Sequence, residues 1–115
     1  MIEVTILNYL NSDNRLSAPA FMEIPKTKPS KFFILEKTGS TLENHIYSST
    51  FTIQSYADTM YNAALMNEEV IDVMLNGLIM EGDIAKVDLN TDYNFTDTTT
   101  KQYRYQSVFI ITYEE

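Results

Sequence analysis

Hydrophobic and polar residues alternate clearly near the C-terminus, in the segment KQYRYQSVFIITY at residues 101–113. Successive side chains of a strand point to opposite faces, so this segment has a core face and a second face. The core face carries Tyr103, Tyr105, Ser107, Phe109, Ile111 and Tyr113. The second face begins polar and ends apolar, with Gln102, Arg104, Gln106, Val108, Ile110 and Thr112. The apolar half of this second face must therefore be covered by another segment of the chain or by a partner.

Three other segments have the pattern of strands. KFFILEK at 31–37 is apolar on both faces in its middle. HIYSSTFTIQ at 45–54 sets Tyr47, Phe51 and Ile53 against Ser48, Thr50, Thr52 and Gln54. IAKVDLNTDYNF at 84–95 sets Ala85, Val87, Leu89, Tyr93 and Phe95 against Lys86, Asp88, Asn90 and Asn94. TGSTLEN at 38–44, with Gly39 as its most permissive residue, and TDTTT at 96–100 are predicted turns between strands.

Two segments have helical spacing. IEVTILNYL at 2–10 aligns Ile2, Ile6, Tyr9 and Leu10, and turn formers follow at 11–14. A second helical pattern follows Ser55, its predicted cap, and ends at Gly82 and Asp83. Its predicted inward stripe is Ala57, Met60, Ala64, Ile71, Met74 and Leu78, and its outward stripe is Asn62, Glu69, Asp72 and Asn76. One kinked helix and two short helices both fit this pattern.

The order of these segments predicts an α+β fold. Pro19, Pro25 and Pro29 forbid a helix between the first helix and the strands, and allow at most a short edge strand around residues 21–24. The predicted order is α-(β)-β-β-α-β-β. Hairpin-like links join the strands in pairs, which favours an antiparallel sheet packed against helices on one face. A length of 115 residues, 44% of them hydrophobic, suits a single domain spanning 1–115.

The charge is distributed unevenly along the chain. Residues 1–57 carry five basic and five acidic side chains, whereas residues 58–115 carry three basic and eleven acidic ones, which accounts for the net charge of −8. No Lys or Arg lies between Lys37 and Lys86. Because phosphate binding requires a basic patch, this distribution argues against strong nucleic-acid binding. The simplest interpretation is an acidic surface that keeps the protein soluble.

The sequence offers no candidate catalytic or cofactor site. The chain has no cysteine, which excludes disulfides, thiol nucleophiles and cysteine-bound metals. His45 is the only histidine, and the three glycines at 39, 77 and 82 cannot form a phosphate-binding loop. The N-terminus lacks the pattern of a signal peptide, and no apolar run approaches the roughly 18 residues of a membrane span. We therefore expect a soluble intracellular protein with no catalytic residues and no cofactor.

Residues 88–99 resemble the opening of a calcium-binding loop, because Asp88, Asn90, Asp92 and Asn94 alternate there. Such a loop requires glycine at its sixth position and a bidentate glutamate at its twelfth. Tyr93 and Thr99 occupy these two positions. Polar residues that alternate on the solvent-exposed face of a strand explain the pattern, so we expect no metal site.

Four strings of sequence resemble one protein family. KFFILEKTGS, FTIQSYADTMYNAALMNEEVIDVM, LNTDYNFTD and KQYRYQSVFIITY, in this order, are similar to the small tail-completion proteins of long-tailed bacteriophages and prophages. These proteins are also called tail terminators or tail-to-head joining proteins. The resemblance covers nearly the whole chain and includes no catalytic motif. It implies an α+β fold and a homo-hexameric ring that caps the head-proximal end of the tail tube.

The resemblance also implies partners and a location. The partners are further copies of the chain, the tail tube protein, and a neck or head-completion protein. DNA passes through the central channel without specific binding, and no membrane is involved. The location is the tail or neck of the virion, and the host bacterial cytoplasm during assembly.

A closed ring requires two different patches on each subunit. We expect an interface at Arg104, Val108 and Ile110, joined by Phe33 and Leu35 or by Phe32 and Ile34 on the opposite side. Cover by the first helix or the proline-rich segment of the same chain is the alternative. Other functions that stay open are another head–tail connector of the neck, a non-phage interaction module, and a small ligand-binding domain or enzyme that uses His45.

Overall fold

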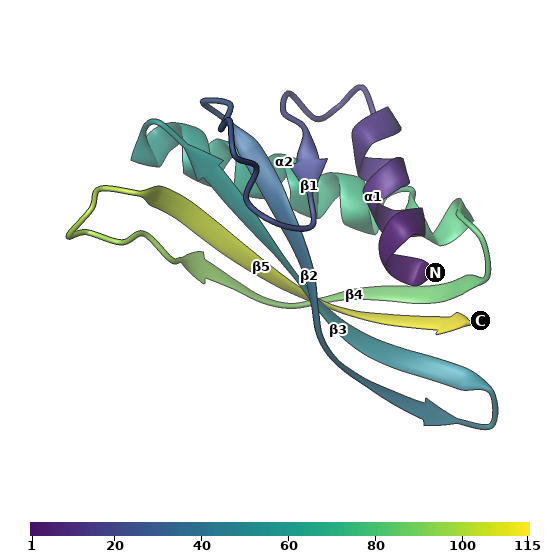
Figure 1. Cartoon of the computed structure of the whole chain (residues 1–115). Helices are drawn as coiled ribbons and strands as arrows, with labels where there is room; N and C mark the ends of the chain where they lie inside the picture. The colour runs from purple at the N-terminus through teal and green to yellow at the C-terminus, as the bar shows by residue number, and fades with distance from the viewer.

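The computed structural model describes residues 1–115, and it has the predicted α+β fold (Figure 1). A five-stranded sheet has the order β1-β2-β3-β5-β4. β1 runs parallel to β2 and the other neighbours are antiparallel, so the sheet is mixed. The elements in chain order are α1 (Ile2–Ser12), β1 (Ala20–Phe21), β2 (Phe32–Glu43), β3 (Ile46–Ala57), α2 (Met60–Leu75), the short 3₁₀ helix η1 (Leu78–Met80), β4 (Ile84–Asn94) and β5 (Tyr103–Glu114).

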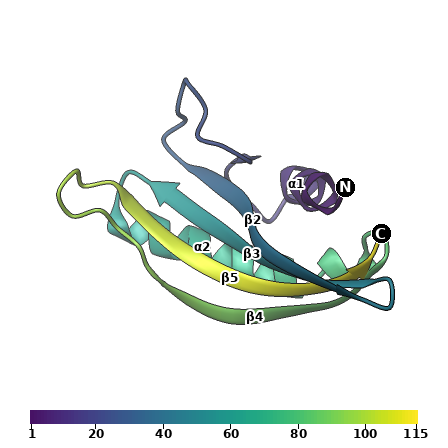
Figure 2. The same ribbon diagram turned by 60° about the horizontal axis from the view of Figure 1, so that its bottom comes forward.

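Both helices lie on the same face of the sheet (Figures 1 and 2). α1 packs on β1 and β2, and α2 packs on β3, β5 and β4. Seventeen buried residues form the core between the helices and this face. The core face predicted for the last strand is confirmed, because Phe109, Ile111 and Tyr113 belong to this core. We call the other side of the sheet the open face; β5 contributes Arg104, Gln106, Val108, Ile110 and Thr112 to it.

The β2–β3 turn lies later in the chain than predicted. Glu43 pairs with Ile46, and the two residues between them, Asn44 and His45, have φ values of +52° and +66°. Positive φ at both central residues is typical of the type I′ turn that suits a two-residue hairpin. Gly39 instead lies inside β2, at a shift in the β2–β3 register. Residues 38–43 therefore extend the strand.

The helix α2 begins later than predicted and buries a different stripe. Thr59 is its cap, and the Thr59 side chain accepts a hydrogen bond from the Asn62 backbone N–H at 3.1 Å. Ser55, the predicted cap, is buried in β3. Of the predicted inward positions within α2, only Met74 is buried. The buried residues of α2 are Ala63, Met66, Asn67, Val70, Val73 and Met74.

Two register shifts in β4 change which side chains face the helices. They lie between Ile84 and Lys86 and between Leu89 and Thr91. Val87 and Leu89 pack against the core, as predicted. After the second shift the alternation is reversed, because an extra residue in one strand turns the following side chains over. Tyr93 and Phe95 were predicted to share a side with Val87, and this prediction is wrong. They lie on the open face.

Candidate interaction surface

The middle of the open face is uncharged on β3 and β5. Val108 pairs with Thr52 and Thr91, and Ile110 pairs with Thr50 and Asp88. Val108 and Ile110 are half-buried, although both helices pack on the other side of the sheet. Flanking strands and cross-strand neighbours therefore shield these two side chains only at their edges. This leaves apolar surface at the centre of a four-stranded antiparallel array.

One corner of the open face is covered by the chain itself. The Phe32 ring stacks on the Tyr56 ring at a centroid distance of 4.7 Å, and the Phe21 ring meets Phe32 edge-on at 6.5 Å. Phe32 and Ile34 are only 4% and 6% exposed. Phe21 belongs to the proline-rich segment, so this segment provides part of the cover. The first helix does not, because α1 packs on the other face.

Phe33 and Leu35 are too deeply buried to contact a neighbouring subunit. They are 0% and 2% exposed, and both belong to the core beneath the helices. Their inclusion among the expected interface residues is therefore corrected. The alternation of β2 places Phe32 and Ile34, not Phe33 and Leu35, on the same face as Val108 and Ile110.

A row of polar side chains crosses three strands of the open face. The Tyr56 hydroxyl donates to Gln54 Oε1 at 2.7 Å, and Gln54 Nε2 donates to Gln106 Oε1 at 2.9 Å. Gln106 Nε2 in turn donates to the Tyr93 hydroxyl on β4. Each hydrogen bond orients the next side chain, so the row is fixed in place. Sequence patterning could not reveal it, because the Tyr93 position depends on the register shift in β4.

Arg104 lies at the end of this row and is held without a carboxylate partner. Arg104 Nε donates to the Phe95 carbonyl oxygen at 2.7 Å, and Nη1 donates to Gln102 Oε1 at 3.2 Å. The guanidinium carbon lies 4.4 Å from the centre of the Phe95 ring, a cation–π distance. Arg104 forms no salt bridge within the chain. Its positive charge is therefore preorganised on the open face for an acidic group of a partner.

The β4–β5 turn beside Arg104 is closed by Asp97. Asp97 Oδ1 accepts hydrogen bonds from the backbone N–H of Thr99 at 3.0 Å and of Thr100 at 3.4 Å. These backbone hydrogen bonds, first Thr100 and then Thr99, lower the pKa of Asp97 below its ordinary value of 3.8, and the nearby Arg104 charge adds to this. The turn is thus more stable with Asp97 ionised.

The lowered pKa of Asp97 predicts a pH-dependent contribution to stability. Because the folded pKa lies below the unfolded one, the contribution is complete above the unfolded pKa and is lost as the pH falls through the folded pKa. We expect Asp97→Asn to lower the free energy of unfolding at neutral pH, and the difference from the wild type to shrink in acid. Urea denaturation at neutral pH and at about pH 2.5 measures both differences.

Asp83→Asn is the charge-matched control for this experiment. It removes one carboxylate whose side chain forms no hydrogen bond in the chain; the backbone oxygen of Asp83 accepts from the Glu114 N–H and is retained. An Asp97→Asn protein as stable as the wild type at neutral pH would contradict the role given to this turn.

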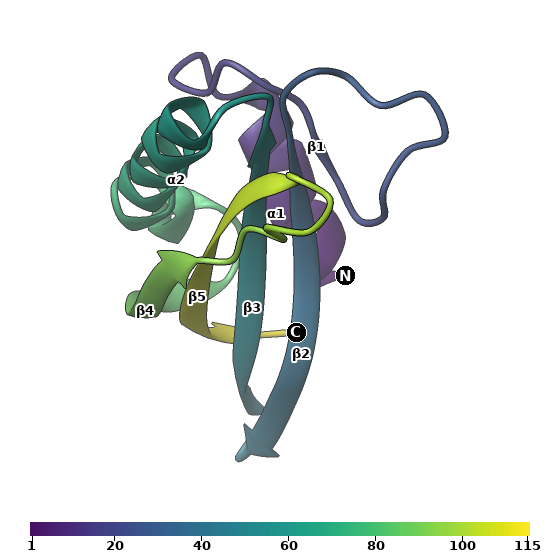
Figure 3. The ribbon, with the colours of Figure 1, turned by 90° about the vertical axis from the view of Figure 1, so that its left-hand side faces the viewer.

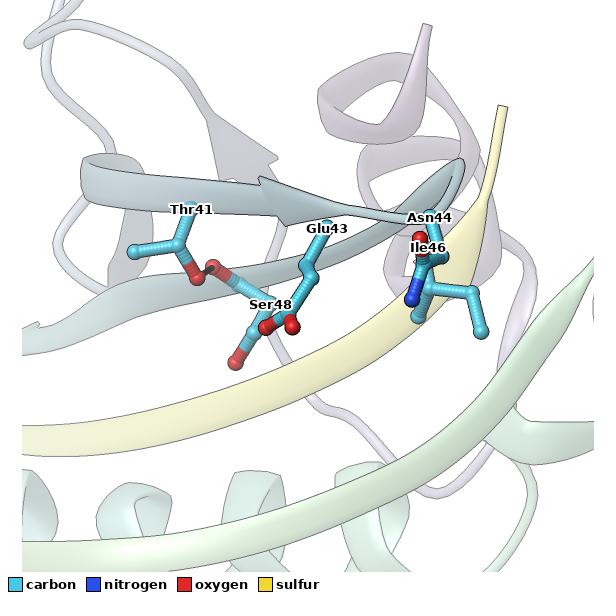
Figure 4. A pocket seen from close by; sticks show the side chains of 5 residues that line it. All are labelled: Thr41, Glu43, Asn44, Ile46 and Ser48. Atoms are coloured by element: carbon cyan, nitrogen blue, oxygen red, sulfur yellow. Dashed lines mark hydrogen bonds between the residues drawn. The ribbon is translucent and has the colours of Figure 1, made fainter.

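The open face also includes a hollow at the far end of the β2–β3 hairpin, lined by Thr41, Glu43, Asn44, Ile46 and Ser48 (Figure 4). Glu43 is its only titratable side chain. His45 occupies the adjoining turn and is exposed, and its side chain forms no hydrogen bond or salt bridge. No three His, Cys, Asp or Glu side chains are close enough together to hold a metal ion. The hollow does not bring His45 together with an acidic partner.

Comparison with known proteins adds no family. Neither the models of known protein families nor the curated proteins include a match to the chain. None of the helices combines the length and the apolar character that crossing a bilayer requires. The candidate surface is therefore supported by its geometry alone: the apolar pair Val108 and Ile110, the polar row, and the fixed charge of Arg104.

Proposed function

We propose that this protein is a structural subunit of a phage tail, a ring-forming terminator that caps the tail tube and connects it to the neck. Two arguments support the proposal. The sequence resembles tail-completion proteins along nearly its whole length. The open face offers apolar surface at Val108 and Ile110 beside the fixed charge of Arg104, a combination suited to binding a protein partner.

The open face is the observation that carries this proposal. An assembly subunit needs surface that stays solvated in the free protein and is buried on binding. Val108 and Ile110 are half-buried and lie beside the hydrogen-bonded glutamines Gln54 and Gln106. They meet this need without exposing a large apolar patch. A further copy, the tube protein and a neck protein are the proposed occupants of the surfaces of the subunit.

Capping of tail tubes tests the proposal directly. Purified protein is added to tubes assembled without a terminator, and the ends are imaged by negative stain. We expect the wild type to cap one end of each tube and Ile110→Lys to fail. The Lys side chain would lie opposite Asp88 in the β4–β5 register, so the isolated subunit tolerates the change while a charge enters the centre of the open face.

Thr98→Lys is the matched control, because it adds the same charge at an exposed position of the β4–β5 turn. It should cap tubes like the wild type. Unfolding free energies of both variants within about 1 kcal/mol of the wild type establish that folding is retained. Uncapped tubes with wild-type protein, together with binding to a neck protein, would instead indicate another connector of the neck.

A further inference from the structure

The loop at residues 22–31 is the basic segment of an acidic protein. It contains Lys26, Lys28 and Lys31, which are three of the eight basic residues of the chain, and one acidic residue, Glu23. We call it the basic loop. Lys26 and Lys28 are exposed, and so are the apolar residues Met22 and Ile24, at 46% and 44%. The loop projects from the body of the molecule beside β1 (Figure 3). Met22 and Ile24 are thus apolar surface left exposed by the rest of the chain, and the lysines that follow them form no salt bridge.

The helix α2 carries a complementary row of exposed side chains. Tyr61, Leu65, Glu68, Asp72 and Leu75 are spaced four and three residues apart, so they form one line along the outward side of the helix. We call this line the α2 ridge. Tyr61 is 75% exposed and Leu65 is 41% exposed. The carboxylates of Glu68 and Asp72 form no salt bridge within the chain. From Tyr61 to Asp72 the ridge therefore changes from apolar to acidic, as the basic loop changes from apolar to basic, and Leu75 ends the ridge.

The two segments also match in length. Met22 to Lys28 is six residues, which span at most about 20 Å at roughly 3.3 Å per residue, and less in the structure because the chain bends at residues 22–23 and 26–27. Tyr61 to Asp72 is eleven residues, which span about 16 Å in a helix at 1.5 Å per residue. Met22 and Ile24 can thus lie against Tyr61 and Leu65 while the two lysines reach the two carboxylates.

The basic loop and the α2 ridge cannot meet within one molecule. Figure 3 shows them at opposite edges of the sheet, with the loop beside β1 at one edge and α2 over β3, β5 and β4 toward the other. A contact between them joins two copies head to tail, and repeated head-to-tail contacts close into a ring or continue as a filament. We propose that the basic loop of one copy docks on the α2 ridge of the next copy. This inference rests on the proposed function, because it supplies the contact from which a ring is built.

The strength of such a contact is limited by its exposure. Two solvent-exposed ion pairs contribute little each, and salt weakens them further. Self-association is therefore expected to be weak and salt-sensitive in dilute solution. The tube end would concentrate the copies and complete the ring.

A reciprocal charge exchange tests the docking. Sedimentation velocity at low ionic strength measures self-association of the wild type and of the Lys26→Glu/Lys28→Glu protein. We expect about tenfold weaker association, since two attractive pairs become repulsive. Glu68→Lys/Asp72→Lys should weaken association equally, and the protein carrying all four changes should recover it. Lys86→Glu/Lys101→Glu makes the same change in net charge outside both segments and serves as the control. No recovery in the fourfold variant would overturn the inference.

Cysteine cross-linking gives a second readout, and the absence of natural cysteines makes it specific. A mixture of Ile24→Cys and Leu65→Cys proteins should form a disulfide-linked dimer on oxidation, because docking brings the two positions within the Cα distance that a disulfide requires. Ile24→Cys mixed with Thr98→Cys should not. The outcomes separate the two proposals. Capping of tubes without this cross-link overturns the loop–ridge contact alone, whereas the cross-link without capping supports the contact and contradicts the tail function.

Discussion

Phe109→Ala is expected to lower the free energy of unfolding by about 3–5 kcal/mol, the cost of removing a large aromatic side chain from a packed core. Phe109 is fully buried, and it pairs with Phe51 on β3 and Leu89 on β4. α2 packs on the same strands, so few neighbours can move to fill the cavity. Urea denaturation of both proteins at the same pH measures the difference.

Val108→Ala is the matched comparison, one residue away on the other face. Val108 is half-buried and lies where no helix packs, so its truncation should cost about 1 kcal/mol or less. The contrast between adjacent residues tests the assignment of the two faces in the isolated protein. Equal losses for the two variants would mean that the open face is covered as fully as the core face.

The fold class could be predicted because most of the strands show clean alternation. In β3 and β5 the apolar set occupies every second position, and the register brings Phe51 opposite Phe109 and Ile53 opposite Ser107. The first helix was predictable from its helical spacing, since Ile2, Ile6 and Leu10, four residues apart, are its buried residues. The pattern of one-sided burial then places both helices on one face of the sheet.

The phase of α2 could not be predicted from hydrophobicity because a polar residue occupies its inward side. Asn67 is 2% exposed, and its Nδ2 donates to Asp92 Oδ2 at 2.9 Å. Meanwhile Tyr61 and Leu65 are exposed. The apolar stripe predicted from the sequence therefore lies on a different side of α2 from the residues that are buried. Asp92 itself reaches the helix only because of the register shift in β4. Neither the inward position of Asn67 nor that of Asp92 can therefore be predicted from its own segment.

The candidate surface was predictable in part. Val108 and Ile110 followed from the apolar end of the second face of β5, and the uneven charge pointed to an acidic second half. The position of Arg104 against Phe95 depends on the register shift between Leu89 and Thr91, which no propensity indicates. The pairing of the basic loop with the α2 ridge could not be predicted from the sequence, because it depends on their positions at opposite edges of the sheet.

Gly77→Ala is expected to destabilise the protein by about 3 kcal/mol, through steric overlap and backbone strain together. Gly77 has φ +154°, and a Cβ at this position would overlap the Tyr9 hydroxyl. That hydroxyl donates to the Val73 carbonyl oxygen at 2.7 Å and so ties α1 to the last turns of α2. Burial raises the pKa of Tyr9, which keeps the hydroxyl protonated as a donor. Thermal unfolding measures the loss.

Gly82→Ala separates the two causes. Gly82 also has positive φ, +55°, but the nearest atom to an added Cβ is a Thr5 methyl carbon at 4.0 Å, so only backbone strain of about 1 kcal/mol is expected. A double-mutant cycle with Tyr9→Phe isolates the overlap. Tyr9→Phe alone loses the hydrogen bond to Val73, yet in the Gly77→Ala background it removes the overlapping hydroxyl and should recover part of the loss. The backbone strain remains, as do the close contacts of the added Cβ with Arg15 Nη2 at 3.1 Å and Tyr9 Cζ at 3.2 Å. Strict additivity of the two losses would show that Gly77 is required for its backbone conformation alone, and that the close approach of α1 to the end of α2 does not depend on it.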